Sequence, residues 1–214
     1  MTDGLSHPVR SDARDNRARV LEAARAVFGQ EGLGAPVREV AREAGVGPAT
    51  LYRHFPAKQV LIAEAFADQR RACYAVVRDA LSDPDPWRGF RSLIERVCEL
   101  HANSGRFADV FMAAFPEALD FAADRERTLR AVSELARRAQ AAGLLRPGFV
   151  VDDLVLMLLA HRGVHDAPRA ARITASRRFA AYVIEAFRAM PGRAGPALPP
   201  PVQLLRAAPP SCTA

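Results

Sequence analysis

Residues 37–58 read VREVAREAGVGPATLYRHFPAK, and this stretch predicts two short helices joined by a tight turn. Its first half places apolar side chains at intervals of three and four residues, as on one buried face of a helix. Pro36 suits the first helical position, where no N–H donor is needed. Gly45 accepts the positive φ that often ends a helix. The expected buried face consists of Val37, Val40, Ala41 and Ala44.

The second helix is expected to have Gly47 as its N-cap and to end before Pro56, because proline cannot continue a helix. Leu51 and Phe55 are one turn apart and should face the core. The opposite face, with its small residues, could then approach a DNA major groove closely. Spacing alone equally fits a helical hairpin inside any all-α protein. The residues expected on the exposed face or within reach of phosphates are Pro48, Ala49, Thr50, Tyr52, Arg53, His54 and Lys58.

Residues 19–66 contain AARAVFGQEG, VREVAREAGVGPATLYRHF and the continuation KQVL, and they resemble the N-terminal domain of TetR-type transcriptional regulators. The resemblance implies a three-helix helix-turn-helix DNA-binding domain followed by a helical ligand-binding and dimerisation domain. It also implies a homodimer on a palindromic double-stranded DNA operator, and it adds Arg38 and Gly47 to the expected DNA contacts. Two departures concern Pro36 and Gly47, where the family usually has hydroxyl residues that serve in capping or phosphate contact.

Composition sets wide bounds on function. The 214 residues carry a formal charge of +6, but residues 1–60 and 61–214 share this excess, so charge supports DNA binding only weakly. Cys73, Cys98 and Cys212 form no CxxC motif and indicate a reducing, cytoplasmic compartment. The first sixteen residues lack an apolar segment and do not resemble a signal peptide. The longest apolar run is too short to span a bilayer, so no membrane association is expected.

Composition and periodicity give the expected domain boundaries, and the resemblance implies the roles of the domains. Residues 1–13 read as a flexible arm, 14–60 as the helix-turn-helix domain, 61–190 as the ligand-binding and dimerisation domain, and 191–214 as a disordered tail rich in proline, alanine and glycine. The first helix should begin at Arg14 and end near Gln30. Residues 57–81 contain neither proline nor glycine and predict one continuous helix between the domains.

A bulky apolar segment at residues 106–115 is either part of a solid core or the lining of a cavity for a largely apolar ligand. The resemblance favours the cavity and a small-molecule effector with one polar group. The expected ligand-binding residues are Phe66, Tyr74, Leu93, Val97, His101, Phe107, Phe111, Met112 and Phe115.

Two last helices are expected at residues 151–165 and 168–190. In the family that the chain resembles, these helices pair with their copies in a four-helix dimer interface. The residues that the chain offers for this interface are Leu154, Leu158, Tyr182, Val183 and Phe187.

Catalysis is not expected, because no GxSxG, HExxH, P-loop or GxGxxG motif is present. The pairs His161/His165 and Cys98/His101 have metal-compatible spacing but incomplete ligand sets, so no metal and no cofactor is predicted. The resemblance to TetR-type regulators implies a ligand-responsive transcriptional regulator, and we expect a repressor released from its operator by a small, largely apolar effector. The alternative is a helical small-molecule- or metal-binding protein that no longer depends on DNA.

Overall fold

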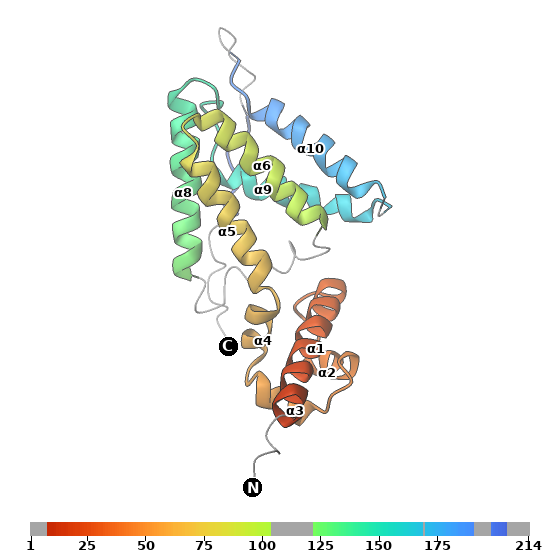
Figure 1. Cartoon of the computed structure of the whole chain (residues 1–214). Coiled ribbons are helices and arrows are strands. Elements are labelled where there is room, and N and C mark those ends of the chain that lie inside the picture. The colour runs from red at the N-terminus through yellow and green to blue at the C-terminus, as the bar shows by residue number, and fades with distance from the viewer. Residues whose placement is uncertain (1–7, 104–121, 169, 191–197, 205–214) are drawn as a thin grey trace, which may run out of the picture.

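The computed structural model of the chain describes residues 8–103, 122–168, 170–190 and 198–204. Within these ranges the regular structure is helical, apart from an isolated bridge between Leu145 and Arg188. The predicted all-α fold is confirmed (Figure 1). The α-helices are α1 (Pro8–Glu31), α2 (Val37–Glu43), α3 (Pro48–His54), α4 (Lys58–Ala65), α5 (Ala67–Ser82), α6 (Pro86–Asn103), α8 (Ala122–Ala141), α9 (Val151–His161) and α10 (Arg172–Phe187), and a 3-10 helix, η1 (Arg162–Asp166), precedes α10.

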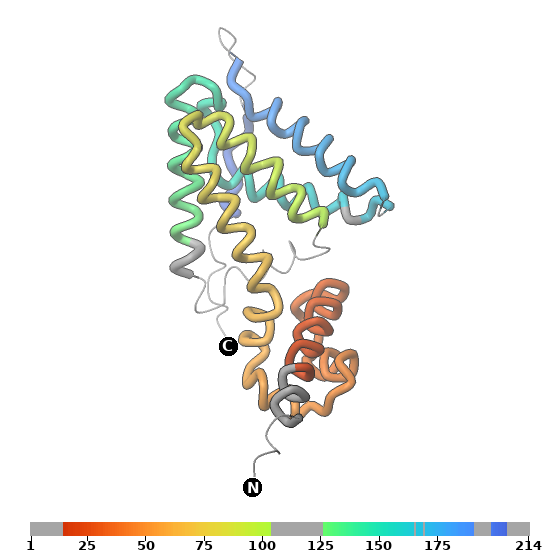
Figure 2. The backbone as a smooth tube through the Cα atoms, in the orientation of Figure 1, coloured from red at the N-terminus to blue at the C-terminus, as the bar shows by residue number. Residues whose placement is uncertain are grey.

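Helices α1 to α4 gather at one end of the molecule and pack around a common N-terminal core (Figure 2). The apolar faces predicted for α2 and α3 are turned toward this core, and Phe28 of α1 and Phe55 are fully buried in it. The core consists of Val20, Ala23, Ala24, Val27, Phe28, Ala35, Val37, Val40, Ala41, Ala44, Leu51, Phe55, Leu61, Ala65 and Phe66.

The first helix begins earlier than predicted. Helix α1 starts at Pro8 rather than Arg14, so the expectation of a flexible arm was wrong for residues 8–13. Proline is compatible with the first turn of a helix, and the charged residues that follow do not interrupt it. Residues 1–7 lie outside the described part of the chain.

The single helix predicted for residues 57–81 is divided at Phe66, whose backbone leaves the helical conformation with φ −109° and ψ 15°. The Phe66 side chain is buried in the N-terminal core, whereas Val76 and Val77 of α5 are buried in a second core. Arg25 of α1 donates from Nη1 to the Ala65 carbonyl at 3.3 Å, where α4 ends. The break therefore lets consecutive turns serve two different cores, which a count of proline and glycine cannot reveal.

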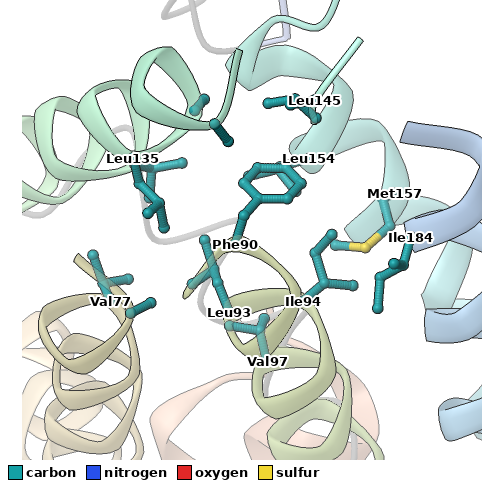
Figure 3. Packing of buried hydrophobic residues seen from close by; sticks show 14 of the residues in the cluster. Val77, Phe90, Leu93, Ile94, Val97, Leu135, Leu145, Leu154, Met157 and Ile184 are labelled. Atoms are coloured by element: carbon teal, nitrogen blue, oxygen red, sulfur yellow. The ribbon is translucent and has the colours of Figure 1, made fainter. Parts of the chain in front are cut away.

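Helices α5, α6, α8, α9 and α10 enclose this second, C-terminal core (Figure 3). Phe90 of α6 is fully buried near its centre and makes edge contacts with Phe149 and Phe187, at ring-centroid distances of 5.2 and 6.3 Å. Aromatic pairs in this geometry add about 0.5–1.5 kcal/mol beyond the area that they bury. The core consists of Val76, Val77, Ala80, Phe90, Leu93, Ile94, Val97, Cys98, Val132, Leu135, Ala136, Ala139, Leu145, Phe149, Leu154, Met157, Ala180 and Ile184.

The C-terminal helices are shorter than predicted. Helix α9 ends at His161, and residues 162–166 continue as the 3-10 helix η1, which includes Gly163, a poor helix former. Helix α10 begins at Arg172 rather than Pro168. Residues 198–204, the described part of the predicted tail, contain no helix or strand, and the Leu204 N–H donates to Asp152 Oδ1 at 2.6 Å. None of the described helices is long and apolar enough to cross a membrane.

Helix α6 starts where the sequence predicts and crosses α5 very closely. Asp85 Oδ1 accepts hydrogen bonds from the N–H groups of Trp87 and Arg88, so Asp85 caps the helix that Pro86 begins. One turn later, a Cβ atom placed on Gly89 would lie 2.3 Å from the carbonyl oxygen of Ala80. Glycine therefore sets the distance between α5 and α6 at this point.

We predict that Gly89→Ala lowers the free energy of unfolding by about 1–3 kcal/mol, because α5 or α6 must shift to admit the methyl group. Denaturant unfolding followed by circular dichroism measures this loss. Gly29→Ala is the matched control, since no atom lies within 4 Å of the added Cβ in α1. Alanine favours a helix over glycine by roughly 0.8–1.0 kcal/mol, so the control should be neutral or stabilising. Equal stability of both variants would contradict the close crossing.

Candidate functional site

The turn between α2 and α3 holds the two helices at a fixed angle. Gly45 has φ +64°, its N–H donates to the Arg42 carbonyl at 3.1 Å, and the Val46 N–H donates to the Ala41 carbonyl at 3.0 Å. These two bonds form a Schellman motif, in which glycine takes the left-handed conformation after the helix end. Val46 is half-buried and packs against the N-terminal core. The turn predicted from the sequence is confirmed.

The start of α3 also matches the prediction. Gly47 is extended, Pro48 occupies the first helical position, and the Leu51 N–H donates to the Gly47 carbonyl at 3.1 Å. Leu51 and Phe55 are buried at 1% and 0% exposure. The opposite side of the helix is consequently open, with Tyr52 50% exposed. We call this side the α3 face; its members are Gly47, Pro48, Ala49, Tyr52 and Arg53, all exposed.

Neither of the two short helices has a side-chain cap. Pro36 is the N-cap of α2 rather than its first residue, and Gly47 is the N-cap of α3. Neither N-cap residue accepts a side-chain hydrogen bond from the N–H groups of its helix start. The helix starts are thus formed by backbone geometry and by Pro48, and their N–H groups remain available to an external acceptor such as phosphate.

The cations near the α3 face differ in their contacts. Glu39 accepts from Arg42 Nε at 2.9 Å and lies 3.8 Å from Arg38 Nε, and its hydrogen bond raises the pKa of Arg42. Arg53 has no ion-pair partner among the residues that the structure describes. Lys58, the first residue of α4, places its Nζ 5.6 Å from the centroid of the Phe28 ring. The face thus presents more positive than negative charge.

Two of the expected phosphate contacts are less open than the others. Thr50 is half-buried. His54 is also half-buried, and its Nε2 is enclosed without a hydrogen-bond partner in the described part of the chain. The His54 ring lies 6.4 Å from that of Phe55. This nitrogen faces the protein interior, so the structure does not place it where a phosphate could reach it directly.

A cavity of about 100 Å³ lies in the C-terminal core between α5, α6, α8 and α9. Of the predicted ligand-binding residues, Leu93 and Val97 line it. Cys73 also lines it, and burial raises the pKa of this thiol to about 11, which keeps it protonated at neutral pH. Sequence reasoning missed most of the wall, which comprises Cys73, Val77, Leu93, Ile94, Val97, Thr128, Leu129, Val132, Val151, Leu154, Val155, Met157 and Leu158.

Other predicted ligand-binding residues lie elsewhere. The expectation for Phe66 was wrong, because its side chain is buried in the N-terminal core. Tyr74 lines a groove beside the cavity rather than the cavity itself. The remaining four, Phe107, Phe111, Met112 and Phe115, lie outside the described residues.

His101 belongs to a buried polar cluster. Its ring lies 6.0 Å from that of His161, whose Nε2 is 2.9 Å from the hydroxyl of Ser176. The Ser176 hydroxyl donates to the Cys98 carbonyl at 3.0 Å and so joins α10 to α6. Sequence reasoning missed Ser176, although a serine within an apolar helix stripe commonly bonds a backbone carbonyl. Within the described ranges, no three His, Cys, Asp or Glu side chains gather as a metal site.

The residues expected at a dimer interface divide into two groups. Tyr182 is 59% exposed, with the Arg178 guanidinium 5.2 Å from its ring centroid. Leu154, which was expected at the dimer interface, is buried in the C-terminal core. Leu158, Val183 and Phe187 are half-buried and pack against that same core. Leu156, which sequence reasoning overlooked, is 53% exposed on the other side of α9.

Comparison of the sequence with known proteins identifies its N-terminal part. Residues 20–65 match the profile of bacterial regulatory proteins of the tetR family. An HTH-type transcriptional regulator of Staphylococcus aureus (strain USA300) is 43% identical over 54 residues, which are 25% of this chain and 29% of that protein. Regulators of other strains of this species match to the same extent. The chain thus matches less than a third of the length of these relatives.

Solved structures extend the similarity to the fold of nearly the whole chain. The ketosteroid transcriptional regulator KstR2 of Mycobacterium tuberculosis superposes with a TM-score of 0.63 at 22% identity, over 81% of this chain and 95% of that one. A TetR family regulator from Marinobacter aquaeolei VT8 gives 0.58 at 17% identity, over 85% and 100%. Residues 20–65 are thus a helix-turn-helix domain of the type found in bacterial regulatory proteins of the tetR family, and the chain shares the all-helical fold of these solved regulators.

Proposed function

We propose that the protein is a ligand-responsive, sequence-specific DNA-binding transcriptional regulator, and that it acts as a repressor which a small effector releases from a palindromic operator. The observation that carries this proposal is the α3 face: an open helix side, fixed by the Gly45 turn, with small residues at its start and Arg53 beyond them. A helix held in this way is the part of a helix-turn-helix that enters a major groove.

The chemistry of the α3 face divides its residues into two roles. Gly47, Pro48 and Ala49 have little side-chain bulk and allow the helix start to come close to base edges. Arg53 extends from the same side and supplies a fork of donors for guanine or phosphate. The remaining polar groups, Thr50, the Tyr52 hydroxyl, Lys58 and Arg38, would fix the position on the DNA backbone, whereas the enclosed His54 would make no direct phosphate contact.

Two copies are required for a palindromic operator, because each protomer reads one half-site. Helix-turn-helix dimers place their recognition helices about 34–36 Å apart, one turn of B-DNA. In this chain Leu156 of α9 and Tyr182 of α10 are large, exposed side chains, and they would be buried in an interface between the two copies. A change in the relative position of the two helix-turn-helix domains would then prevent the two recognition helices from fitting successive major grooves.

The effector would act through α5. Cys73 and Val77 on this helix form part of the cavity wall. The helix begins at Ala67, immediately after Phe66, which is packed in the N-terminal core. Helix α4 is joined to α1 by an ion pair between Arg17 and Glu64 and by the bond from Arg25 to the Ala65 carbonyl. A ligand that displaces α5 would therefore displace the helix-turn-helix domain as well.

We predict that Tyr52→Ala weakens binding to all DNA sequences by roughly tenfold, because one phosphate contact of about 1–1.5 kcal/mol is lost. Arg53→Ala should instead change the order of preference among operator variants. Fluorescence anisotropy with fragments from the neighbourhood of the gene, at low and moderate salt, measures both effects. The affinity of the unaltered protein should fall steeply with salt.

Arg91→Ala is the charge-matched control, since Arg91 lies on α6 in the C-terminal domain and pairs with Glu95 at 3.5 Å. It should bind DNA as the unaltered protein does. Normal operator binding by Tyr52→Ala would show that the docking is wrong. A folded dimer that binds no fragment with salt-sensitive affinity would favour a helical ligand-binding protein that no longer depends on DNA.

We further predict that Leu156→Arg combined with Tyr182→Arg shifts the protein from dimer to monomer, because four guanidinium groups would be brought together in an apolar contact. Sedimentation velocity at equal concentrations measures the shift. Val60→Arg is the control, since Val60 is an exposed apolar residue of α4, with 37% exposure, outside the proposed interface. An unchanged dimer in the double variant would place the interface elsewhere.

A further inference from the structure

The cavity in the C-terminal core adjoins a second hollow of different chemistry. A groove of about 350 Å³ runs between α5 and α8, two helices that lie side by side (Figure 1). Val77 and Thr128 line both the groove and the cavity, so these two side chains form a shared wall. One elongated molecule that passes this wall could occupy both spaces.

The cavity accepts only apolar groups of modest size. Among the described residues its wall contains aliphatic side chains, Met157, one thiol and one threonine, and it contains no charged or aromatic residue. Val77 of α5 and Leu93 of α6 extend into the space between their helices (Figure 3). Burial of an unpaired charge here would cost several kcal/mol, whereas an apolar cavity of roughly 150 Å³ holds benzene. The occupant is therefore a short alkyl group.

The groove differs from the cavity in the residues that border it. Most of its lining surface is apolar, but its described lining residues include Arg78, Arg127 and Tyr74 and no Asp or Glu. Both arginines are exposed. Two guanidinium groups and a phenol are a donor set that suits a carboxylate or a phosphate ester.

The nearest carboxylate to Arg78 does not cancel this charge. Asp79 accepts from Arg96 Nη1 at 3.0 Å and from Arg78 Nη2 at 3.2 Å. The bonds from Arg96 and then Arg78 hold the pKa of Asp79 below its usual range, so it stays ionised. One negative charge thus faces two positive charges, and the cluster keeps a net positive charge beside the groove.

We infer that the cavity and the groove form one binding site for an amphipathic anion. The alkyl chain lies in the cavity between α5, α6, α8 and α9, and the carboxylate or phosphate head lies in the groove at Arg78 and Arg127. This inference rests on the proposed function for its regulatory meaning, because it names the chemical class of the effector. It identifies the polar group of the largely apolar effector expected from the sequence as an anionic one.

Isothermal titration calorimetry on the purified protein tests the inference with four probes of equal chain length: octanoate, octyl phosphate, octanol and octyltrimethylammonium. Octanoate or octyl phosphate should bind at least about tenfold more tightly than octanol, and the cation should not bind. Comparison of the two anions distinguishes a carboxylate from a phosphate head. Added salt should weaken the anions but not octanol.

The variant Arg78→Gln with Arg127→Gln should raise the Kd of octanoate by about tenfold and leave that of octanol unchanged. Arg130→Gln is the control, because Arg130 is an exposed arginine of α8 that pairs with Glu126 and lines neither hollow. Val132→Phe should abolish binding of both octanoate and octanol by filling the cavity. Leu158→Phe, at a half-buried cavity position, serves if Val132→Phe does not fold.

Equal affinity for octanoate and octanol, or no effect of the arginine changes, would overturn the inference, as would the absence of binding by any probe. The DNA experiments keep the two proposals separate. If octanoate binds with the expected preferences but leaves the operator complex intact, the site stands and the effector role fails. If octanoate releases the operator and the arginine variant needs about tenfold more of it, both stand.

Discussion

The packing of Phe66 is the constraint on which the relation between the two parts of the molecule depends. Its side chain belongs to the N-terminal core, and the next helical residue already belongs to α5, whose later turns belong to the C-terminal core. A flexible linker would let the cores move independently, but here a single residue separates two helices. Because buried aromatic side chains are close-packed and resist small displacements, any movement of α5 has to be accommodated by α4.

A second constraint acts inside the N-terminal domain. The left-handed conformation of Gly45 and the two bonds of the Schellman motif fix α3 relative to α2, while Leu51 and Phe55 fix its rotation about its own axis. The orientation of the α3 face is thus set by backbone geometry and by two buried side chains. This explains how the domain keeps its shape although Pro36 and Gly47 provide no side-chain caps.

Local patterns predicted the N-terminal domain well, because its decisive features lie within a few residues of one another. The apolar stripe of α2, the Gly45 turn and the inward Leu51 and Phe55 follow from spacing alone. The limits of α5 and α9 did not follow, since they depend on which core a residue joins. Leu154 and Leu156 illustrate the difficulty: in the apolar run LVLML, periodicity cannot tell the buried side from the exposed one. The cavity wall consists of residues from four helices, and a local sequence pattern does not indicate which helices pack together.

The two ends of α5 are held in different ways, and this difference determines how a ligand could act. At its C-terminal end, Arg138 of α8 donates to the carbonyls of Leu81 and Asp83 at 2.8 Å each. At the same end, Gly89 of α6 packs so closely against the Ala80 carbonyl that no Cβ atom would fit between them. That end is bound to both neighbouring helices. The cavity and the groove lie further toward the N-terminal end, at Cys73, Tyr74 and Val77.

A molecule inserted at these positions would therefore tilt α5 about its fixed C-terminal end, and the displacement would be largest at Ala67, beside Phe66. A ligand shifts such an equilibrium only by the difference in its affinity for the two arrangements. An apolar group alone gains similar contacts wherever the walls close on it. In the proposed site, contacts of an anion with Arg78 and Arg127, on two different helices, would depend far more strongly on the spacing of those helices, and they would supply the difference that a switch requires.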